Sequence, residues 1–173
     1  MDIRRLTAQD AESYRQIRAE ALQLEPQAFT ESSAQHQALT LETIRHRLGS
    51  DASDDNFVLG AFDGSRLVGT AGFFRRQGEK IRHRGEIWGV YIAKQYRGRG
   101  LGCALLEELI RQLRSQPGLE QVALGVSTGN VAAKRLYQAL GFETYGCEAR
   151  ALKIGDSYVD EELMVLYLRG EST

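Results

Sequence analysis

Three glycines in alternate positions, Gly98, Gly100 and Gly102, lie directly between a strand pattern and a helix pattern. Residues 86–92 before them are rich in aromatic and β-branched side chains, which favours a strand. Residues 101–113 after them carry apolar side chains every three or four positions, which predicts a helix that buries one face. The chain must therefore pass from strand through a tight glycine loop into a helix.

This loop has the chemistry to hold a diphosphate. The first turn of a helix has N–H groups without partners and a partial positive charge, and glycines allow a ligand to come close to them. Arg97 and Arg99 add donors for phosphate oxygens. Glycines also serve simple turns, and the Arg-Gly repeat also occurs in nucleic-acid-binding segments. No Gly-Lys-Ser/Thr closes a P-loop, and no acidic residue lies where a dinucleotide fold requires it, so coenzyme A is the favoured nucleotide.

The remaining elements predict an α+β fold: a single mixed, mostly antiparallel sheet with flanking helices. One crossover helix makes the strands at 86–92 and 119–126 a parallel pair. No linker or repeat divides residues 1–173, which we expect to form one domain. The other predicted strands are 3–6, 57–62, 67–74, 142–152 and 163–168. Three other helices are predicted. The first follows the N-cap Thr7, with Asp10 in its first turn, and the other two begin near Leu41 and at Val131.

Composition excludes several classes of protein. The 22 Lys and Arg nearly balance the 23 Asp and Glu, so no field gathers nucleic acid, and no apolar run is long enough to span a membrane. We expect a cytoplasmic protein. The two cysteines, Cys103 and Cys147, and the three histidines lack the spacing of metal ligands, so we expect no metal and interpret the cysteines as core residues.

Two segments resemble the signature of the GNAT acetyltransferases. The first is Val90-Tyr91-Ile92-Ala93-Lys94-Gln95-Tyr96-Arg97-Gly98-Arg99-Gly100-Leu101-Gly102, and the second is Asn130-Val131-Ala132-Ala133-Lys134-Arg135-Leu136-Tyr137-Gln138-Ala139-Leu140-Gly141-Phe142. The order of elements agrees with this family from residue 2 to about 169. One departure is Lys94, where the family usually has proline.

The resemblance implies that acetyl-CoA is the co-substrate and that the protein is an N-acetyltransferase. It also implies that the strand ending at Val90 to Ile92 carries a bulge, offers its main chain to the pantetheine arm and splays from its parallel neighbour, so that the acetyl group lies in the split. The implied cofactor-binding residues are Val90, Tyr91, Ile92, Arg97, Gly98, Arg99, Gly100, Leu101, Gly102, Asn130 and Ala133.

Two residues are candidates for catalysis. Tyr137 lies seven residues after Asn130, on the same helix face, and the resemblance directs its hydroxyl to the departing sulfur. Its alternative role is a core aromatic residue. An alkylamine with a pKa near 10.4 must lose a proton before it attacks a thioester, and Glu86 is our candidate base. The alternative is that Glu86 pairs with an arginine such as Arg82 or Arg84.

The acceptor is the open question. We expect the acceptor to be a primary amine. Residues 153–164 resemble family members that include polyamine acetyltransferases, which implies a small amine. The alternatives are that the acceptor is a protein N-terminus or a lysine, or that the protein is a non-catalytic CoA-binding sensor. Two acidic groups interpreted as loops would favour a polycation if either lies beside the split. They are Asp51, Asp54 and Asp55, and Asp156, Asp160, Glu161 and Glu162. Family members are often dimers, so the resemblance leaves a homodimer open.

Overall fold

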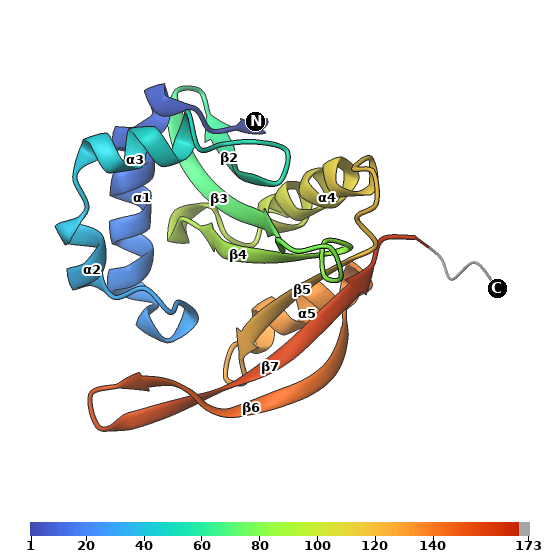
Figure 1. The fold of residues 1–173 in the computed structure, drawn as a ribbon. Coiled ribbons are helices and arrows are strands. Elements are labelled where there is room, and N and C mark those ends of the chain that lie inside the picture. The colour runs from blue at the N-terminus through green and yellow to red at the C-terminus, as the bar shows by residue number, and fades with distance from the viewer. Residues whose placement is uncertain (170–173) are drawn as a thin grey trace.

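A computed structural model describes residues 1–169 and shows one seven-stranded sheet in the order β1-β2-β3-β4-β5-β7-β6 (Figure 1). The pair β4 and β5 is parallel, and all the other neighbouring strands are antiparallel. This confirms the predicted α+β class. The strands are β1 (Asp2–Arg5), β2 (Asn56–Asp63), β3 (Arg66–Arg75), β4 (Arg84–Ile92), β5 (Gln121–Ser127), β6 (Glu143–Ile154) and β7 (Ser157–Tyr167).

Helices cover both faces of the sheet and bury a core on each. The five α-helices are α1 (Ala11–Leu24), α2 (Ser33–Ala38), α3 (Leu41–Leu48), α4 (Leu101–Arg114) and α5 (Val131–Ala139), and short 3-10 turns cover Ala8–Asp10, Pro26–Ala28 and Lys94–Tyr96. Helices α4 and α5 lie on one face of the sheet, and α1 and α3 lie on the other (Figure 1). The leucines of α4 share one core with residues of α5, and α1 and α3 contribute to the second core. The alternation in β2 follows from this, because Phe57 and Leu59 contact the first core and Val58 the second.

Three details differ from the sequence prediction. Helix α2 begins in a stretch that we predicted as broken, because Ser32 and Gln35 form a capping box at its start. Strand β7 begins at Ser157, six residues before the predicted start, so Asp160, Glu161 and Glu162 lie in a strand and not in a loop. Cys147 is exposed on β6 and is not a core residue.

The parallel pair β4 and β5 stays together over only three residue pairs, Arg84 to Gln121 through Glu86 to Ala123. Beyond them the two strands separate, and we call the space between them the split. A bulge lies on the same stretch of β4, since Trp88 pairs with Gly72 and Tyr91 with Thr70. Gly89, in this bulge, has a left-handed φ of 61°. The structure therefore shows both the bulge and the splaying that the resemblance implied.

Candidate active site

A pocket of about 400 Å³ lies in the split. Its walls come from the bulged part of β4, the glycine loop with the start of α4, the end of β5 and the start of α5. The segment around Phe29 closes it on the α1 side of the sheet. Eleven of the thirteen predicted site residues line this pocket: Val90, Tyr91, Ile92, Arg97, Gly98, Gly100, Leu101, Gly102, Asn130, Ala133 and Tyr137.

The glycine loop has the open backbone that a diphosphate requires. Gly98 and Gly100 have left-handed φ values of 72° and 77°, and no atom lies within 4 Å of where their Cβ would be. Gly100 is the N-cap of α4, so the first N–H groups of this helix have no partner inside it. Gly102 faces α5, where a Cβ would come within 3.3 Å of Leu136. These features fit the phosphate end of coenzyme A.

The two loop arginines differ in their surroundings. Arg97 lines the pocket, and its Nε donates to the carbonyl of Ile92 at 2.9 Å while its Nη1 pairs with Glu25 at 2.9 Å. It thereby ties the segment after α1 to the glycine loop. Arg99 lies over the ring of Tyr96, 5.7 Å from its centroid, and does not line the pocket. The structure thus places only one of the two predicted arginines at the pocket.

Tyr137 is buried at the pocket wall, with 7% of its surface exposed, and its ring packs edge-on against Phe142. Burial raises the pKa of its phenol well above the ordinary value. The hydroxyl therefore stays protonated at neutral pH and can donate a proton. Asn130, on the same wall, caps α5 by accepting a hydrogen bond from the N–H of Ala133 at 3.1 Å.

Glu86 occupies the last paired position of β4, opposite Ala123, where the split begins. Its carboxylate pairs with a nearby arginine, as the alternative expected, although the partner is Arg76 and not Arg82 or Arg84. The Glu86 side chain does not line the pocket. Its role as base remains a prediction.

Cys103 lines the pocket on the first turn of α4 and is the nearest candidate for a covalent nucleophile. Its thiol donates to Glu107 at 3.4 Å, and both burial and this carboxylate raise its pKa. A raised pKa keeps sulfur in the less reactive thiol form. The site therefore favours direct transfer over a cysteine-bound intermediate.

A buried arginine on the α1 side of the pocket was not among the predicted site residues. Arg18 of α1 is 6% exposed and lies beside Phe29 and Trp88, which both line the pocket. Its position between the apolar residues Ile17 and Ala21 was the available signal, since arginine is seldom buried on an apolar helix face without a specific partner.

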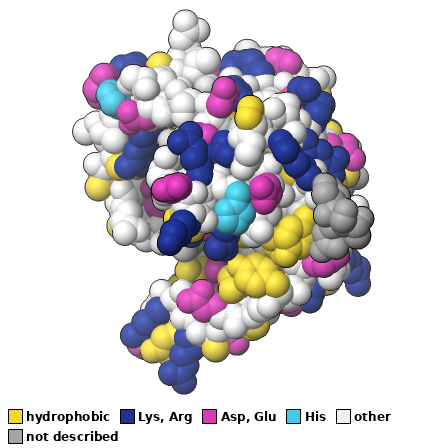
Figure 2. Space-filling view, turned by 45° about the vertical axis from the view of Figure 1, so that its right-hand side comes forward, with side chains coloured by type: hydrophobic (Ala, Val, Ile, Leu, Met, Phe, Trp, Pro, Cys, Tyr) yellow, Lys and Arg dark blue, Asp and Glu magenta, His cyan; other side chains and the backbone are white. Residues whose placement is uncertain are grey.

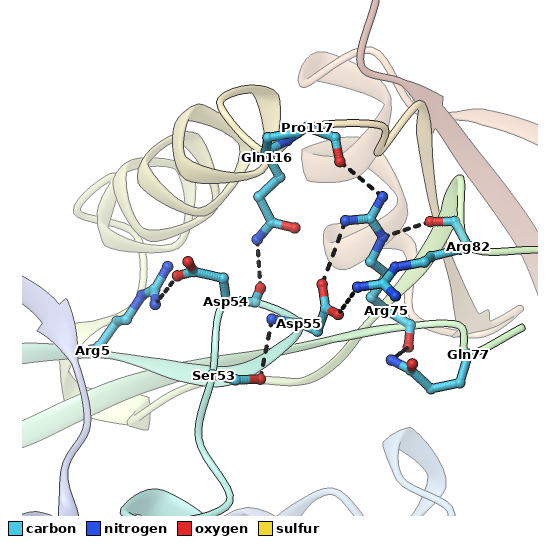
Figure 3. Close-up of polar contacts among 9 residues, drawn as sticks. All are labelled: Arg5, Ser53, Asp54, Asp55, Arg75, Gln77, Arg82, Gln116 and Pro117. Carbon is cyan, nitrogen blue, oxygen red and sulfur yellow. Dashed lines mark hydrogen bonds and ion pairs between the residues drawn. The ribbon is translucent and has the colours of Figure 1, made fainter. Parts of the chain in front are cut away.

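The first acidic group does not lie at this pocket. Asp54 pairs with Arg5, and Asp55 pairs with both Arg75 and Arg82, around a second cavity that Gln116 also lines (Figure 3). In the second group, Glu162 pairs with Lys134 at 2.6 Å. Acidic and basic side chains also lie next to one another over the face shown in Figure 2. The expectation of an acidic, polycation-attracting rim is therefore wrong for the first group.

One carboxylate of the second group does approach the pocket. Glu161 of β7 reaches the pocket-lining Gly125 of β5, where a Cβ would meet its Oε2 at 2.7 Å. Burial and the neighbouring Glu148 raise the pKa of Glu161. Within residues 1–169 there is no cluster of three or more potential metal-binding side chains, and no helix there has the length and apolarity to cross a membrane.

Comparisons with known proteins agree with this geometry. The model of the acetyltransferase (GNAT) family matches residues 16–142. The chain is 37% identical over 109 residues to N-alpha-acetyltransferase RimI of Mycobacterium tuberculosis, covering 62% of this chain and 66% of that protein. It is 30% identical over 119 residues to the spermine/spermidine N(1)-acetyltransferase of Bacillus subtilis, covering 65% and 77%.

Solved structures share the whole fold. An acetyltransferase of the GNAT family from Streptococcus pneumoniae superimposes with a TM-score of 0.86 at 28% identity, covering 96% of this chain and 98% of the other. A ribosomal-protein-alanine N-acetyltransferase from Brucella melitensis gives 0.83 at 27% identity, covering 96% and 99%. The chain matches less than two thirds of several curated relatives, including 19% of a mycothiol acetyltransferase from Thermobispora bispora. With most of its length matched by the family model, the chain belongs to the acetyltransferase (GNAT) family of acyltransferases.

Proposed function

We propose that this protein is an N-acetyltransferase, formed by residues 1–173 as one domain, that moves an acetyl group from acetyl-CoA to a primary amine. The observation that carries this proposal is the pocket in the split, which runs from the open glycine loop at Gly98 and Gly100 to the buried phenol of Tyr137. A phosphate-binding end and a proton-donating end in one pocket suit a thioester substrate. We also propose a cytoplasmic location for the enzyme.

Residues of this chain have separable tasks in the proposal. The N–H groups that begin α4 bind the diphosphate, and the bulged main chain of Val90 to Ile92 holds the pantetheine arm. When bound, acetyl-CoA supplies the electrophilic thioester carbon. Tyr137 donates its proton to the departing sulfur, and a proton lost by the amine passes to Glu86, directly or through water. Arg76 pairs with this carboxylate and holds it where the split begins.

Small amines are our preferred acceptors over peptides and lysines. Phe29 and Trp88 line the pocket on the α1 side, and the contact between Arg97 and Glu25 fastens the covering segment to the glycine loop. An acceptor must therefore fit under this segment. The relatives include both kinds of enzyme, since one is described as an N-alpha-acetyltransferase and another as a spermine/spermidine N(1)-acetyltransferase.

The test is an acceptor panel of small amines, amino acids, peptides with an unblocked N-terminus and lysine-rich peptides. Release of CoA thiol is followed by a colorimetric assay, and products are identified by mass spectrometry. We expect CoA release with small amines and a product that carries one acetyl group. Acetylation of peptides alone would contradict the small-amine assignment, and tight binding of acetyl-CoA without release for any acceptor would establish the sensor alternative.

A further inference from the structure

Arg18 is a buried cation that the proposed acetyl transfer does not use. Its side chain is 7% exposed, and its Nε donates to Oε2 of Glu31 at 2.9 Å. Its guanidinium carbon Cζ lies 4.6 Å from the ring centroid of Phe29 and 6.0 Å from that of Trp88. Glu31 therefore occupies one edge of the guanidinium, and two pocket-lining aromatic rings flank it.

The opposite edge of this guanidinium has no partner in the described part of the chain. Nη1 is fully buried without a hydrogen bond. Nη2, which is not fully buried, also has no hydrogen-bond partner within residues 1–169. Leaving a buried donor unsatisfied costs on the order of 1–3 kcal/mol, and more when the group is charged. Buried arginines normally satisfy their donors, so this edge indicates that a ligand supplies the acceptor atoms.

The unpartnered edge lies against the bulge of β4, beside the pocket, although Arg18 is not itself one of the pocket-lining residues. A Cβ built on Gly89 would be 3.4 Å from Nη1, and Gly89 belongs to the β4 bulge and lines the pocket. The diphosphate is assigned to the other end, at Gly98 and Gly100. The pantetheine arm and the thioester near the bulge are uncharged, so an anionic group bound by Arg18 belongs to the acceptor.

We propose that Arg18 binds a carboxylate of the acceptor, which makes the acceptor a small amino acid or a compound with a carboxylate equally close to its amine. This inference rests on the proposed acetyl transfer. The two Nη groups form a planar fork that matches the two oxygens of a carboxylate. Because the fork lies beside the bulge where the acetyl group is assigned, only a carboxylate a few bonds from the attacking nitrogen can reach both. Polyamines lack this group.

The test compares L-amino acids with their own carboxamides as acceptors. Leucine and leucinamide, methionine and methioninamide, and glutamine and glutaminamide are assayed by CoA release in the wild type, R18K and R18M. For the best of the three amino acids, we expect the wild-type kcat/KM to be about 10- to 100-fold higher than for the matching amide. This is the effect of losing charge-assisted hydrogen bonds. R18M should reduce this ratio to about 1, mainly through KM. R18K, which keeps the charge but not the fork, should give an intermediate ratio.

Two controls separate recognition from folding. R15M removes a cation from the same helix and should keep the wild-type ratio, because the Arg15 side chain makes no hydrogen bond or ion pair within residues 1–169. Thermal melts show whether R18M folds, and R18K carries the test if R18M does not. Equal turnover of acids and amides by the wild type, an unchanged ratio in the Arg18 variants, or an equal loss of kcat for both acceptors would overturn the proposal.

A calorimetric titration distinguishes failure of this inference from failure of the proposed function. The same acids and amides are titrated into protein saturated with CoA. Tighter binding of acids that disappears in R18M supports carboxylate recognition even if no amine is acetylated, a result that would contradict only the acetyl transfer. Equal binding of acids and amides overturns the Arg18 assignment whether or not turnover occurs.

Discussion

Burial prepares Tyr137 for donating a proton and makes it unsuited to accepting one. Its ring packs against Phe142 in the core on the α4 side, and the low polarity there raises the pKa of the phenol. The proton is therefore retained above pH 10, the ordinary pKa of tyrosine. Sequence spacing identified this residue through Asn130, but the environment that sets its pKa depends on side chains far away in the sequence.

We predict that Tyr137→Phe lowers kcat by about 10- to 100-fold, the usual contribution of a general acid, and leaves the Kd of acetyl-CoA nearly unchanged. A thiol with a pKa near 8.5 leaves moderately well unaided, which keeps the effect small. Because the pKa of Tyr137 is raised, the wild-type rate should not fall between pH 8 and about 10 on account of its ionisation. Stopped assays over this range measure both effects.

The exposed Tyr145 offers a control, and Tyr145→Phe should leave kcat unchanged. An unaltered kcat in Tyr137→Phe would reduce this residue to a packing role.

Glu86→Gln tests the assigned base. Amines are almost fully protonated near pH 7, so help with deprotonation matters most at low pH, and the rate should fall about 10- to 100-fold there and less near pH 10. The exposed Glu143 on β6 provides the matched variant Glu143→Gln, which should retain the wild-type pH profile. A parallel pH profile of Glu86→Gln and the wild type would leave Glu86 as the partner of Arg76 alone, and Glu161 would become the next carboxylate to test.

At the scale of elements, local sequence patterns predicted the secondary structure correctly where a single pattern determines it. The glycine loop, the amphipathic pattern of α4 and the hairpin β2–β3 all carry such signals, and all three are present. The start of β7 was missed because its first residues pair with the exposed strand β6, and a strand exposed on both faces has no hydrophobic alternation to detect. The position of Arg18 beside the pocket could not be predicted, because it depends on contacts with Phe29 and Trp88, which lie on other segments of the chain.

Gly100→Val tests the loop as a binding element. Valine disfavours the left-handed φ of 77°, and its side chain would fill the open space over the first turn of α4. We expect the stabilisation by acetyl-CoA in thermal melts to disappear. Gly155, in the β6–β7 turn, has a φ of 59° and equally open surroundings but does not line the pocket. Gly155→Val should therefore bring similar backbone strain while keeping the shift with acetyl-CoA. Normal binding by Gly100→Val would move the phosphate site elsewhere.

The whole molecule is two groups of strands that meet at β4 and β5. Strands β1 to β4 pack with α1 to α3, whereas β5 to β7 form the other side of the split with α5 (Figure 1). Three residue pairs join the groups, and beyond them the sheet opens into the pocket. The order of elements predicted this parallel pair. The separation after Glu86 came only from the family resemblance, because the packing of several elements determines where paired strands diverge.

Direct transfer between two bound substrates is the central claim, and initial-rate kinetics test it most directly. CoA release is measured while the concentrations of acetyl-CoA and an accepted amine are both varied. Because Cys103 is held as a thiol and Tyr137 as a neutral phenol, no acetylated enzyme should form, and both substrates must be bound together. The predicted result is a set of intersecting double-reciprocal lines, with no CoA release before the amine is added. Parallel lines, or a burst of CoA in the absence of amine, would contradict the account.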